Sequence, residues 1–417
     1  MHIGTIRSKM KDLKTKGFFH ILLGGSLTKI IAFLSSILIV RFISKNEYAF
    51  LSAADNIYAY VYLVTGLGLD IAVLKYCVCD NKAINKAYFS YSFKLGTLVE
   101  IVIVAIAGLY SLFYPLPFPE SKPYLLALIL YPFLYYWVCL LQGFMRARLK
   151  NREYAYASII QTIVIFAFSL GFVFLIGAYS IIVARYVGAV IAIIYIYKCI
   201  RDELKCESFI LPREEKNKFL RFGLSLLLAN VFSMIMPINE TYLINNLVRD
   251  ATITANYKVA NLIPQQLTFF TSAIVTFYFP YFSRMETNLE KRKMSKKVGL
   301  LTFAIIGIIT VVGIVFSPLV IRIVYGNKYN DIGNLMTILW VMHATNAGIR
   351  MLPMNILPAI GYTRFNVYMS VISCVVHFGI DFYCIKTFGV NGAVVAGCSV
   401  YLLSALCYWI YLFKKTT

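Results

Sequence analysis

The feature that most constrains this chain is an apolar stretch that is long enough to cross a lipid bilayer and carries a lysine near its middle. It is GFFHILLGGSLTKIIAFLSSILIVRFISKNEY, residues 17–48, and Lys29 lies close to its centre. A hydrocarbon core about 30 Å thick needs about 20 apolar residues of helix, so the stretch predicts a membrane-spanning helix. A lysine at that depth costs about 2.5 to 3.5 kcal/mol. We therefore expect Lys29 to face protein or a watery cavity, on the same helix face as Gly25, Ala32 and Ser36.

The composition extends this prediction to the whole chain. Of its 417 residues, 60% are hydrophobic and only 14% are charged, and the mean hydropathy is +0.73. Soluble domains do not have this composition. The net charge of +21 comes from short basic runs between apolar segments, which is the arrangement of a membrane topology signal. The distribution argues against nucleic-acid binding. The first apolar stretch is too long for a signal peptide, so we expect it to be retained.

Apolar segments long enough to cross a membrane begin near residues 18, 49, 87, 123, 154, 179, 219, 252, 298, 332, 365 and 390. Lysine and arginine test this count, because they accumulate in cytoplasmic loops. With the N-terminus inside, the cytoplasmic segments hold 28 of the 40 basic residues and the outer loops hold seven. The sequence thus predicts an all-α integral membrane protein with about 12 transmembrane helices and both termini in the cytoplasm.

The longest internal polar connection, RDELKCESFILPREEKNK, follows the sixth predicted helix. It divides the chain into a basic cytoplasmic or interfacial leader (1–16), an N-terminal six-helix lobe (17–200), a cytoplasmic linker (201–218) and a C-terminal six-helix lobe (219–417). Two lobes of six helices have the same orientation in the membrane. This organisation is typical of parallel-repeat transporters, whose substrate site lies between the lobes.

Charged residues inside the predicted spans are candidates for function, because a charge in the membrane is costly and usually faces the bundle interior. The candidates for a substrate cavity are Lys29, Asp55, Arg185, Glu240, Lys258 and Arg350. In the seventh helix, Asn230, Ser233 and Glu240 form a polar stripe that includes Pro237. The alternative for each charged residue is structural pairing within the bundle.

Three further residues are candidates for ion coupling. His377 and Asp381 are separated by one helical turn in the eleventh predicted helix, where they form a potential proton relay. Glu100 lies near the middle of the third helix. A simple hydrogen bond within the helix is the alternative for the His377–Asp381 pair.

No catalytic or metal-binding motif is present. The chain has no HExxH, no GxSxG and no phosphate-binding glycine loop followed by Lys-Ser/Thr. Its nine cysteines include no CxxC and no Cys/His set with metal spacing. We therefore expect no catalytic residues, no metal site and no cofactor.

Three segments carry a resemblance to a known family. They are ILIVRFISKNEYAFLS (37–52), GLGLDIAVLKY (66–76) and INETYLINNLVRDATITANYKVANLI (238–263). They resemble bacterial polysaccharide flippases of the Wzx type, in the superfamily that also contains multidrug and toxin extruders and lipid II flippases. The likeness covers essentially the whole chain. Ala49 stands where the family tends to have glycine, and Glu240 where members often have aspartate.

The resemblance implies a cationic cavity between two six-helix lobes. It also implies a substrate, an oligosaccharide repeat unit of O-antigen or capsule on undecaprenyl diphosphate, that is carried to the outer leaflet of the bacterial inner membrane by alternating access. The basic candidates would attract the anionic head group. Asp55 and Glu240 would balance these charges, bind sugar hydroxyls or take up a coupling proton.

The implied partners are membrane lipids, the lipid-linked oligosaccharide, a polysaccharide polymerase and a chain-length regulator, and no nucleic acid. Two alternatives stay open. One is a small-molecule or drug antiporter of the same superfamily. The other, less favoured, is a membrane glycan polymerase or ligase, although such enzymes usually carry a substantial outer loop with arginines and the outer loops here are short.

Overall fold

The computed structural model describes residues 18–205 and 209–416, and the side chains of these residues except 18–23, 229, 230, 233 and 280. The predicted leader and the side chains of Asn230 and Ser233 lie outside the described part. In that part the chain is helical and contains no strand. It divides into two compact units, Met1–Val231 and Phe232–Thr417, and the division falls within one helix, α10.

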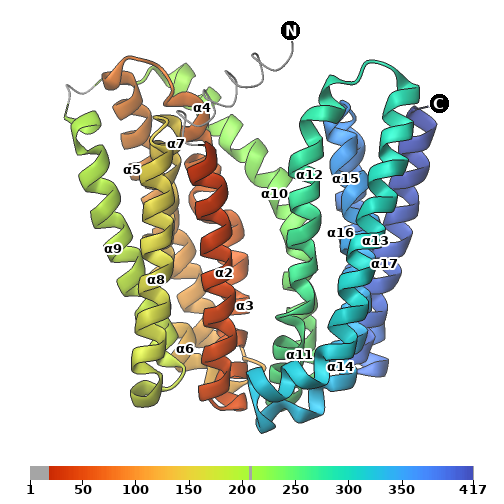
Figure 1. The fold of residues 1–417 in the computed structure, drawn as a ribbon. Coiled ribbons are helices and arrows are strands. Elements are labelled where there is room, and N and C mark those ends of the chain that lie inside the picture. The colour runs from red at the N-terminus through yellow and green to blue at the C-terminus, as the bar shows by residue number, and fades with distance from the viewer. Residues whose placement is uncertain (1–17, 206–208, 417) are drawn as a thin grey trace. The chain divides into compact units, whose positions relative to one another are not determined.

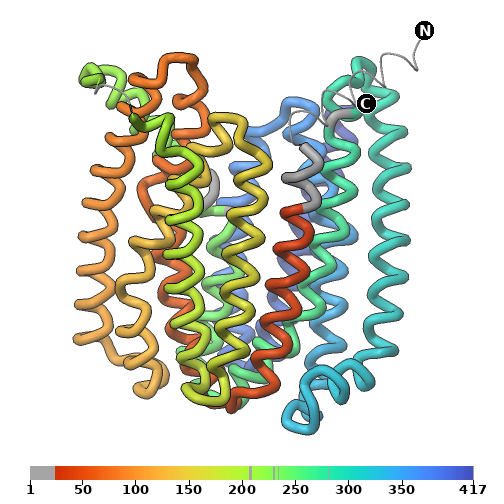
Figure 2. The backbone as a smooth tube through the Cα atoms, turned by 60° about the vertical axis from the view of Figure 1, so that its left-hand side comes forward, coloured from red at the N-terminus to blue at the C-terminus, as the bar shows by residue number. Residues whose placement is uncertain are grey.

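The helices of the first unit follow the predicted spans and are coloured red to green in Figure 1. They are α2 (Phe18–Phe42), α3 (Lys45–Val64), α4 (Leu69–Tyr76), α5 (Lys82–Phe113), α6 (Lys122–Ala127), α7 (Tyr131–Ala147), α8 (Asn151–Ile176), α9 (Tyr179–Leu204) and the first part of α10 (Arg213–Val248). Both α9 and α10 extend into the predicted linker. In two views, α8 lies beside α2 on one side and α9 on the other (Figures 1 and 2).

The second unit contains the rest of α10 and the remaining helices. They are α11 (Ala251–Asn261), α12 (Leu267–Arg284), α13 (Asn288–Val320), α14 (Gly333–Ala344), α15 (Met351–Ala359), α16 (Thr363–Phe388) and α17 (Val390–Lys415). A π-helical turn, Thr345–Arg350, joins α14 to α15. Short helical turns join several other neighbours.

Eight of the described helices are long and apolar enough to cross a membrane, or nine if the bent pair formed by Pro119–Ala127 and Tyr131–Ala147 counts as one span. The remaining stretches carry more polar residues or are broken. The all-α membrane fold is thus confirmed, whereas the number of twelve spans and the location of the termini stay predictions.

The exposure of α16 shows why these helices suit a bilayer. Its buried positions include the polar residues Ser373, His377 and Asp381, whereas Val375 and Tyr383 are both 68% exposed. A helix that exposes apolar side chains and buries polar ones has lipid outside and polar partners inside. Because polar side chains of membrane helices face the bundle interior, we look for the candidate sites in the interior of each unit.

The second predicted span is broken between α3 and α4. Gly66, Leu67 and Gly68 have φ values of +56°, +52° and +72°. This left-handed region is costly for residues other than glycine. The break frees backbone groups, and Glu100 of α5 compensates for one of them, because its carboxylate accepts a hydrogen bond of 2.8 Å from the Gly66 N–H. A carboxylate in the third span thus stabilises the break in the second.

We expect Gly66→Ala to lower the free energy of unfolding by about 1 to 3 kcal/mol, because its backbone is left-handed. A Cβ at this position would also overlap the ring of buried Tyr136. The measurement is denaturant unfolding of the purified protein in detergent. Gly171→Ala in α8 is the matched control, since a Cβ there meets no atom within 4 Å. Equal stability of the two variants would contradict the role assigned to the break.

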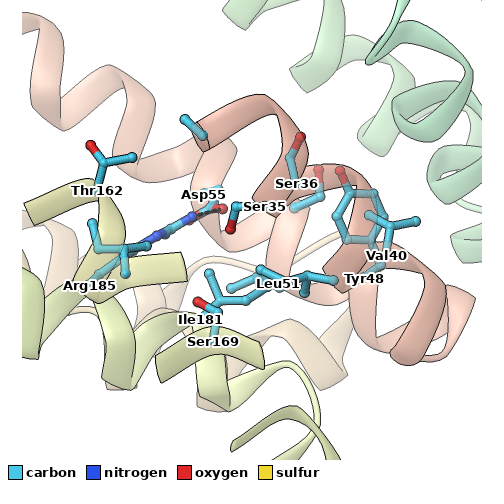
Figure 3. A pocket seen from close by; sticks show the side chains of 14 residues that line it. Ser35, Ser36, Val40, Tyr48, Leu51, Asp55, Thr162, Ser169, Ile181 and Arg185 are labelled. Atoms are coloured by element: carbon cyan, nitrogen blue, oxygen red, sulfur yellow. Dashed lines mark hydrogen bonds and ion pairs between the residues drawn. The ribbon is translucent and has the colours of Figure 1, made fainter. Parts of the chain in front are cut away.

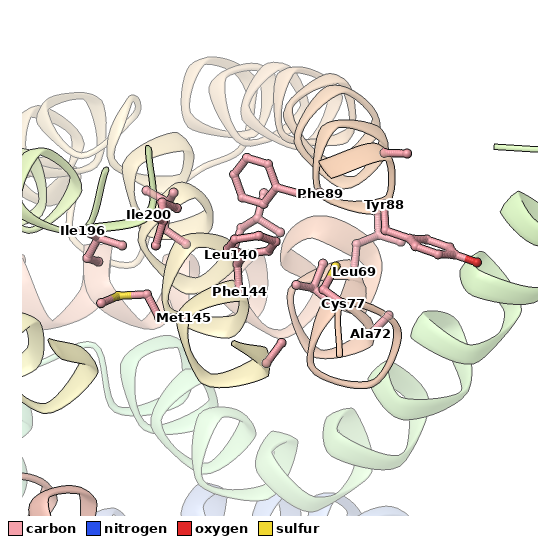
Figure 4. Close-up of a cluster of buried hydrophobic side chains, with 14 of the residues drawn as sticks. Leu69, Ala72, Cys77, Tyr88, Phe89, Leu140, Phe144, Met145, Ile196 and Ile200 are labelled. Carbon is pink, nitrogen blue, oxygen red and sulfur yellow. The ribbon is translucent and has the colours of Figure 1, made fainter. Parts of the chain in front are cut away.

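Apolar clusters hold the helices of each unit together. In the first unit, α4, α5, α7 and α9 meet around Leu69, Phe89, Phe144 and Ile196 (Figure 4). In the second unit, Phe282, Leu352 and Tyr408 belong to a smaller cluster. The eight cysteines of the described residues are free thiols. Burial raises the pKa of the Cys77 thiol, which lies in the first of these clusters just after α4, so this thiol stays protonated.

Candidate functional site

The first group of candidate residues lies within the first unit, where Asp55 of α3 faces Arg185 of α9 (Figure 3). The guanidinium Nη1 lies 2.5 Å from Oδ1, and Nη2 lies 2.8 Å from Oδ2. This is the two-pronged geometry that guanidinium and carboxylate groups favour. The side chain of Arg185 is 24% exposed and that of Asp55 is 32% exposed. Because a carboxylate and a guanidinium carry opposite unit charges, the pair has no net charge.

A cavity of about 300 Å³ adjoins this ion pair. It is lined by residues of four helices, α2, α3, α8 and α9. The lining residues are Ala32, Ser35, Ser36, Ile39, Val40, Tyr48, Leu51, Ser52, Asp55, Thr162, Ile165, Ser169, Ile181 and Arg185. Lys29 is exposed on α2 and is not part of this lining. The structure thus joins Asp55 and Arg185 in one pocket and leaves Lys29 outside it.

The second group lies within the second unit, where α10, α11 and α16 bring ionisable residues together. His377 Nδ1 lies 2.8 Å from Asp381 Oδ2, and its Nε2 lies 3.9 Å from Glu240 Oε2. Tyr257 donates a hydrogen bond to Glu240. The side chains of His377, Asp381 and Glu240 are 1%, 0% and 6% exposed, so the cluster is almost completely buried.

The hydrogen bonding of this second cluster is incomplete. Among the residues that the structure describes, neither ring nitrogen of His377 and neither carboxylate oxygen of Asp381 makes an aligned hydrogen bond. One donor atom from each of Glu240, His377 and Asp381 lies within 4.8 Å of the others, a spacing that suits a bound cation. Two carboxylates on either side of an imidazole equally suit a shared proton. The cluster therefore has the chemistry of an ion-coupling site.

Two basic candidates accompany this cluster in the second unit. Lys258 donates a 2.7 Å hydrogen bond to the Thr241 hydroxyl. Arg350 is buried, donates to Asn346 over 3.1 Å and lies 5.4 Å from the centre of the Tyr401 ring. These residues have local partners within the unit, as structural pairing would provide. Their role in substrate binding stays a prediction.

Glu100, the third candidate for ion coupling, belongs to the first unit. It is fully buried in the first unit, where it accepts the hydrogen bond from Gly66 at the helix break. His377 and Asp381 belong to the second unit. The observed contact gives Glu100 a structural role, and its part in ion coupling stays a prediction.

Two parts of these sites are absent from the sequence predictions. Tyr257 contacts Glu240 although the two residues are on successive helices, and no sequence motif links them. Ser35 and Ser169 line the cavity beside the ion pair. Their small polar side chains within apolar helices were the available signal, since a helix surrounded only by lipid does not need them.

Comparisons with known proteins agree with this architecture. A family model described as "Polysaccharide biosynthesis protein" matches residues 15–286. A Shigella flexneri protein named "Putative O-antigen transporter" is 23% identical over 234 residues, which are 56% of this chain and 54% of that protein. The match thus spans about half the length of that relative.

Two solved structures have a similar fold. The lipid II flippase MurJ, in an inward closed conformation, aligns with a TM-score of 0.74 and 16% identity over 95% of this chain and 89% of that one. An inward-facing multidrug resistance transporter of the MATE family and MOP superfamily aligns with a TM-score of 0.73 and 15% identity, over 95% and 99% of the two chains. At this identity the likeness concerns the fold alone.

Proposed function

This chain belongs to the polysaccharide biosynthesis protein family, and from that premise we propose that it is a transporter rather than an enzyme, namely a flippase for lipid-linked saccharides. The substrate is an oligosaccharide repeat unit on undecaprenyl diphosphate. The protein carries its head group from the cytoplasmic to the outer leaflet of the bacterial inner membrane by alternating access. The observation that carries this proposal is the burial of ionisable groups inside membrane helices of a chain from this family.

The physical basis is the cost of moving the head group. A diphosphate with attached sugars is too polar to cross hydrocarbon unaided, since unsatisfied polar groups cost several kcal/mol each in that medium. Lys29, Lys258 and Arg350 supply positive charge for the diphosphate. The polymerase and the chain-length regulator would act on the product and form the proposed protein partners.

We further propose that protons drive the cycle through Glu240, His377 and Asp381. Histidine is the side chain whose unperturbed titration falls between pH 5 and 8, and His377 lies between the two carboxylates. A change of protonation changes the net charge of a buried cluster that α10 shares with α16. That change biases the packing of these two helices, as coupling to a conformational cycle requires.

The test of the flippase is made in cells that lack the protein. We expect loss of surface polysaccharide and accumulation of the lipid-linked repeat unit in the cytoplasmic leaflet, measured by its resistance to an impermeant periodate or glycosidase probe in sealed spheroplasts. Restoring the gene is the control. Accumulation in the outer leaflet would contradict the proposal.

The same experiment addresses the antiporter alternative. The TM-scores to the lipid flippase and to the multidrug transporter are nearly equal, so the fold does not separate the two substrate classes. Normal surface polysaccharide together with increased sensitivity to cationic drugs would overturn the flippase and support the exporter.

A further inference from the structure

The pocket between α2, α3, α8 and α9 is lined by many hydroxyl groups. Six side chains contribute them, those of Ser35, Ser36, Tyr48, Ser52, Thr162 and Ser169. The rest of the wall is mainly aliphatic. A volume of about 300 Å³ lies at the lower end of the range for small-molecule sites. The pocket therefore has the size and the lining of a site for one small polar ligand.

The hydroxyls of this pocket differ in whether the protein already provides them with a hydrogen-bond partner. Ser36 and Thr162 donate to carbonyl oxygens of their own helices. Ser169 has a buried hydroxyl with no hydrogen-bond partner among the described residues. Because an unpaired polar group is unfavourable in a protein interior, the Ser169 hydroxyl favours a ligand that offers a hydrogen-bonding group in return.

The ion pair determines the charge that the pocket prefers. Asp55 already occupies Nη1 and Nη2 of Arg185. The neutral pair therefore gives no net attraction for a diphosphate and none for an organic cation. Its remaining N–H groups and carboxylate lone pairs still form hydrogen bonds with neutral polar groups.

The shape of the pocket wall also favours a neutral polar ligand. Figure 3 shows Tyr48 on one side of the pocket and the Asp55–Arg185 pair on the other, with Ser35 and Ser36 between them. A pyranose ring has apolar C–H faces and a rim of hydroxyls, so it matches a wall that alternates aliphatic or aromatic surface with hydroxyls. A lipid tail would leave the hydroxyls unpaired, which argues against a hydrocarbon ligand.

We propose that this pocket of the first unit binds one neutral pyranose residue of the substrate's head group. The inference rests on the proposed flippase function and deepens it. It separates the recognition of a neutral sugar, within the first unit, from the attraction of the diphosphate by the basic residues Lys29, Lys258 and Arg350. Arg185, which the sequence suggested as a ligand for the anionic head, becomes a sugar-binding group through its pairing with Asp55.

The test measures binding of neutral methyl glycosides of glucose, galactose, mannose and N-acetylglucosamine to the purified full chain in lipid nanodiscs, by saturation-transfer NMR. Ser35→Ala and Ser52→Ala each remove one lining hydroxyl and little volume. Ser158→Ala is the matched control on α8, because its hydroxyl donates to the Tyr154 carbonyl and does not line the pocket.

We expect at least one neutral glycoside to bind and its affinity to fall about two- to tenfold in each lining variant, the range that one hydrogen bond contributes. Ser158→Ala should bind as the unmodified protein does. Inorganic pyrophosphate, added separately, should show no dependence on either lining serine. Thermal unfolding of each variant without ligand verifies that the fold is intact.

The assignment would be overturned if none of the four neutral glycosides bound. It would also be overturned if binding were the same in Ser35→Ala, in Ser52→Ala and in the unmodified protein. These outcomes are distinguishable from failure of the flippase. Loss of surface polysaccharide in cells lacking the protein, combined with no glycoside binding, rejects the pocket alone. Serine-dependent glycoside binding combined with normal polysaccharide supports the pocket and rejects the flippase.

Discussion

Glu240→Gln is expected to lower translocation of the lipid-linked substrate about 5- to 150-fold, the range that coupling free energies between sites cover. The substitution keeps the size of the side chain and its hydrogen bond with Tyr257 but removes one of the two carboxylates beside His377. The imidazole then loses part of the charge that stabilises its protonated form. The cluster no longer exchanges a proton in step with the conformational cycle.

The measurement is the initial rate of translocation in proteoliposomes with the purified lipid-linked repeat unit, under an imposed pH gradient. Glu286→Gln is the matched control, since Glu286 is exposed, follows the end of α12 and does not belong to the cluster. The amount of reconstituted protein is held constant. An unchanged rate in Glu240→Gln would show that the cluster only holds the helices together.

The same assay distinguishes protons from sodium. With proton coupling, dissipating the pH gradient slows the unmodified protein as strongly as Glu240→Gln does, and a sodium gradient has no effect. Dependence on sodium alone would reject the proton and favour a cation held by Glu240, His377 and Asp381 together, whose donor atoms have suitable spacing.

The sequence predicts which residues share a helix face but not what that face contacts. His377 and Asp381 are one turn apart on α16, so their proximity follows from the helical period alone. Their proximity to Glu240 does not, because it depends on how α10 and α16 pack across a long separation in the chain. The contact between Tyr257 and Glu240 has the same origin.

At the helix break, too, the sequence predicts one part of the structure, and another part depends on tertiary packing. The glycines at positions 66 and 68 indicate that the backbone there can turn, but Leu67 at a φ of +52° has no signature in the sequence. Tertiary packing and the hydrogen bond from Gly66 to Glu100 maintain this conformation. Length and hydropathy located the apolar segments well because they report transfer into lipid, which is a property of each segment by itself.

The Asp55–Arg185 pair was also beyond sequence reasoning, because both residues were expected to face a cavity and neither position identifies the other. Their pairing leads to a prediction about stability. Asp55→Ala should lower the free energy of unfolding by about 3 kcal/mol, the lower part of the range for breaking a buried ion pair, since both side chains are partly exposed. The unpaired Arg185 guanidinium is then left in a membrane helix bundle.

The double variant Asp55→Leu with Arg185→Leu separates this stabilising role from sugar binding. Apolar residues of similar volume often replace a buried ion pair with little loss of stability, so we expect unfolding within about 1 kcal/mol of the unmodified protein. Denaturant unfolding in detergent measures both variants. Stability as low as that of Asp55→Ala would show that the pair contributes more than mutual neutralisation.

If stability recovers as expected, the pocket of the double variant retains its fold but loses its ionic hydrogen-bonding groups, and binding of the neutral glycoside should disappear. Binding that survives would assign recognition to the serine hydroxyls alone.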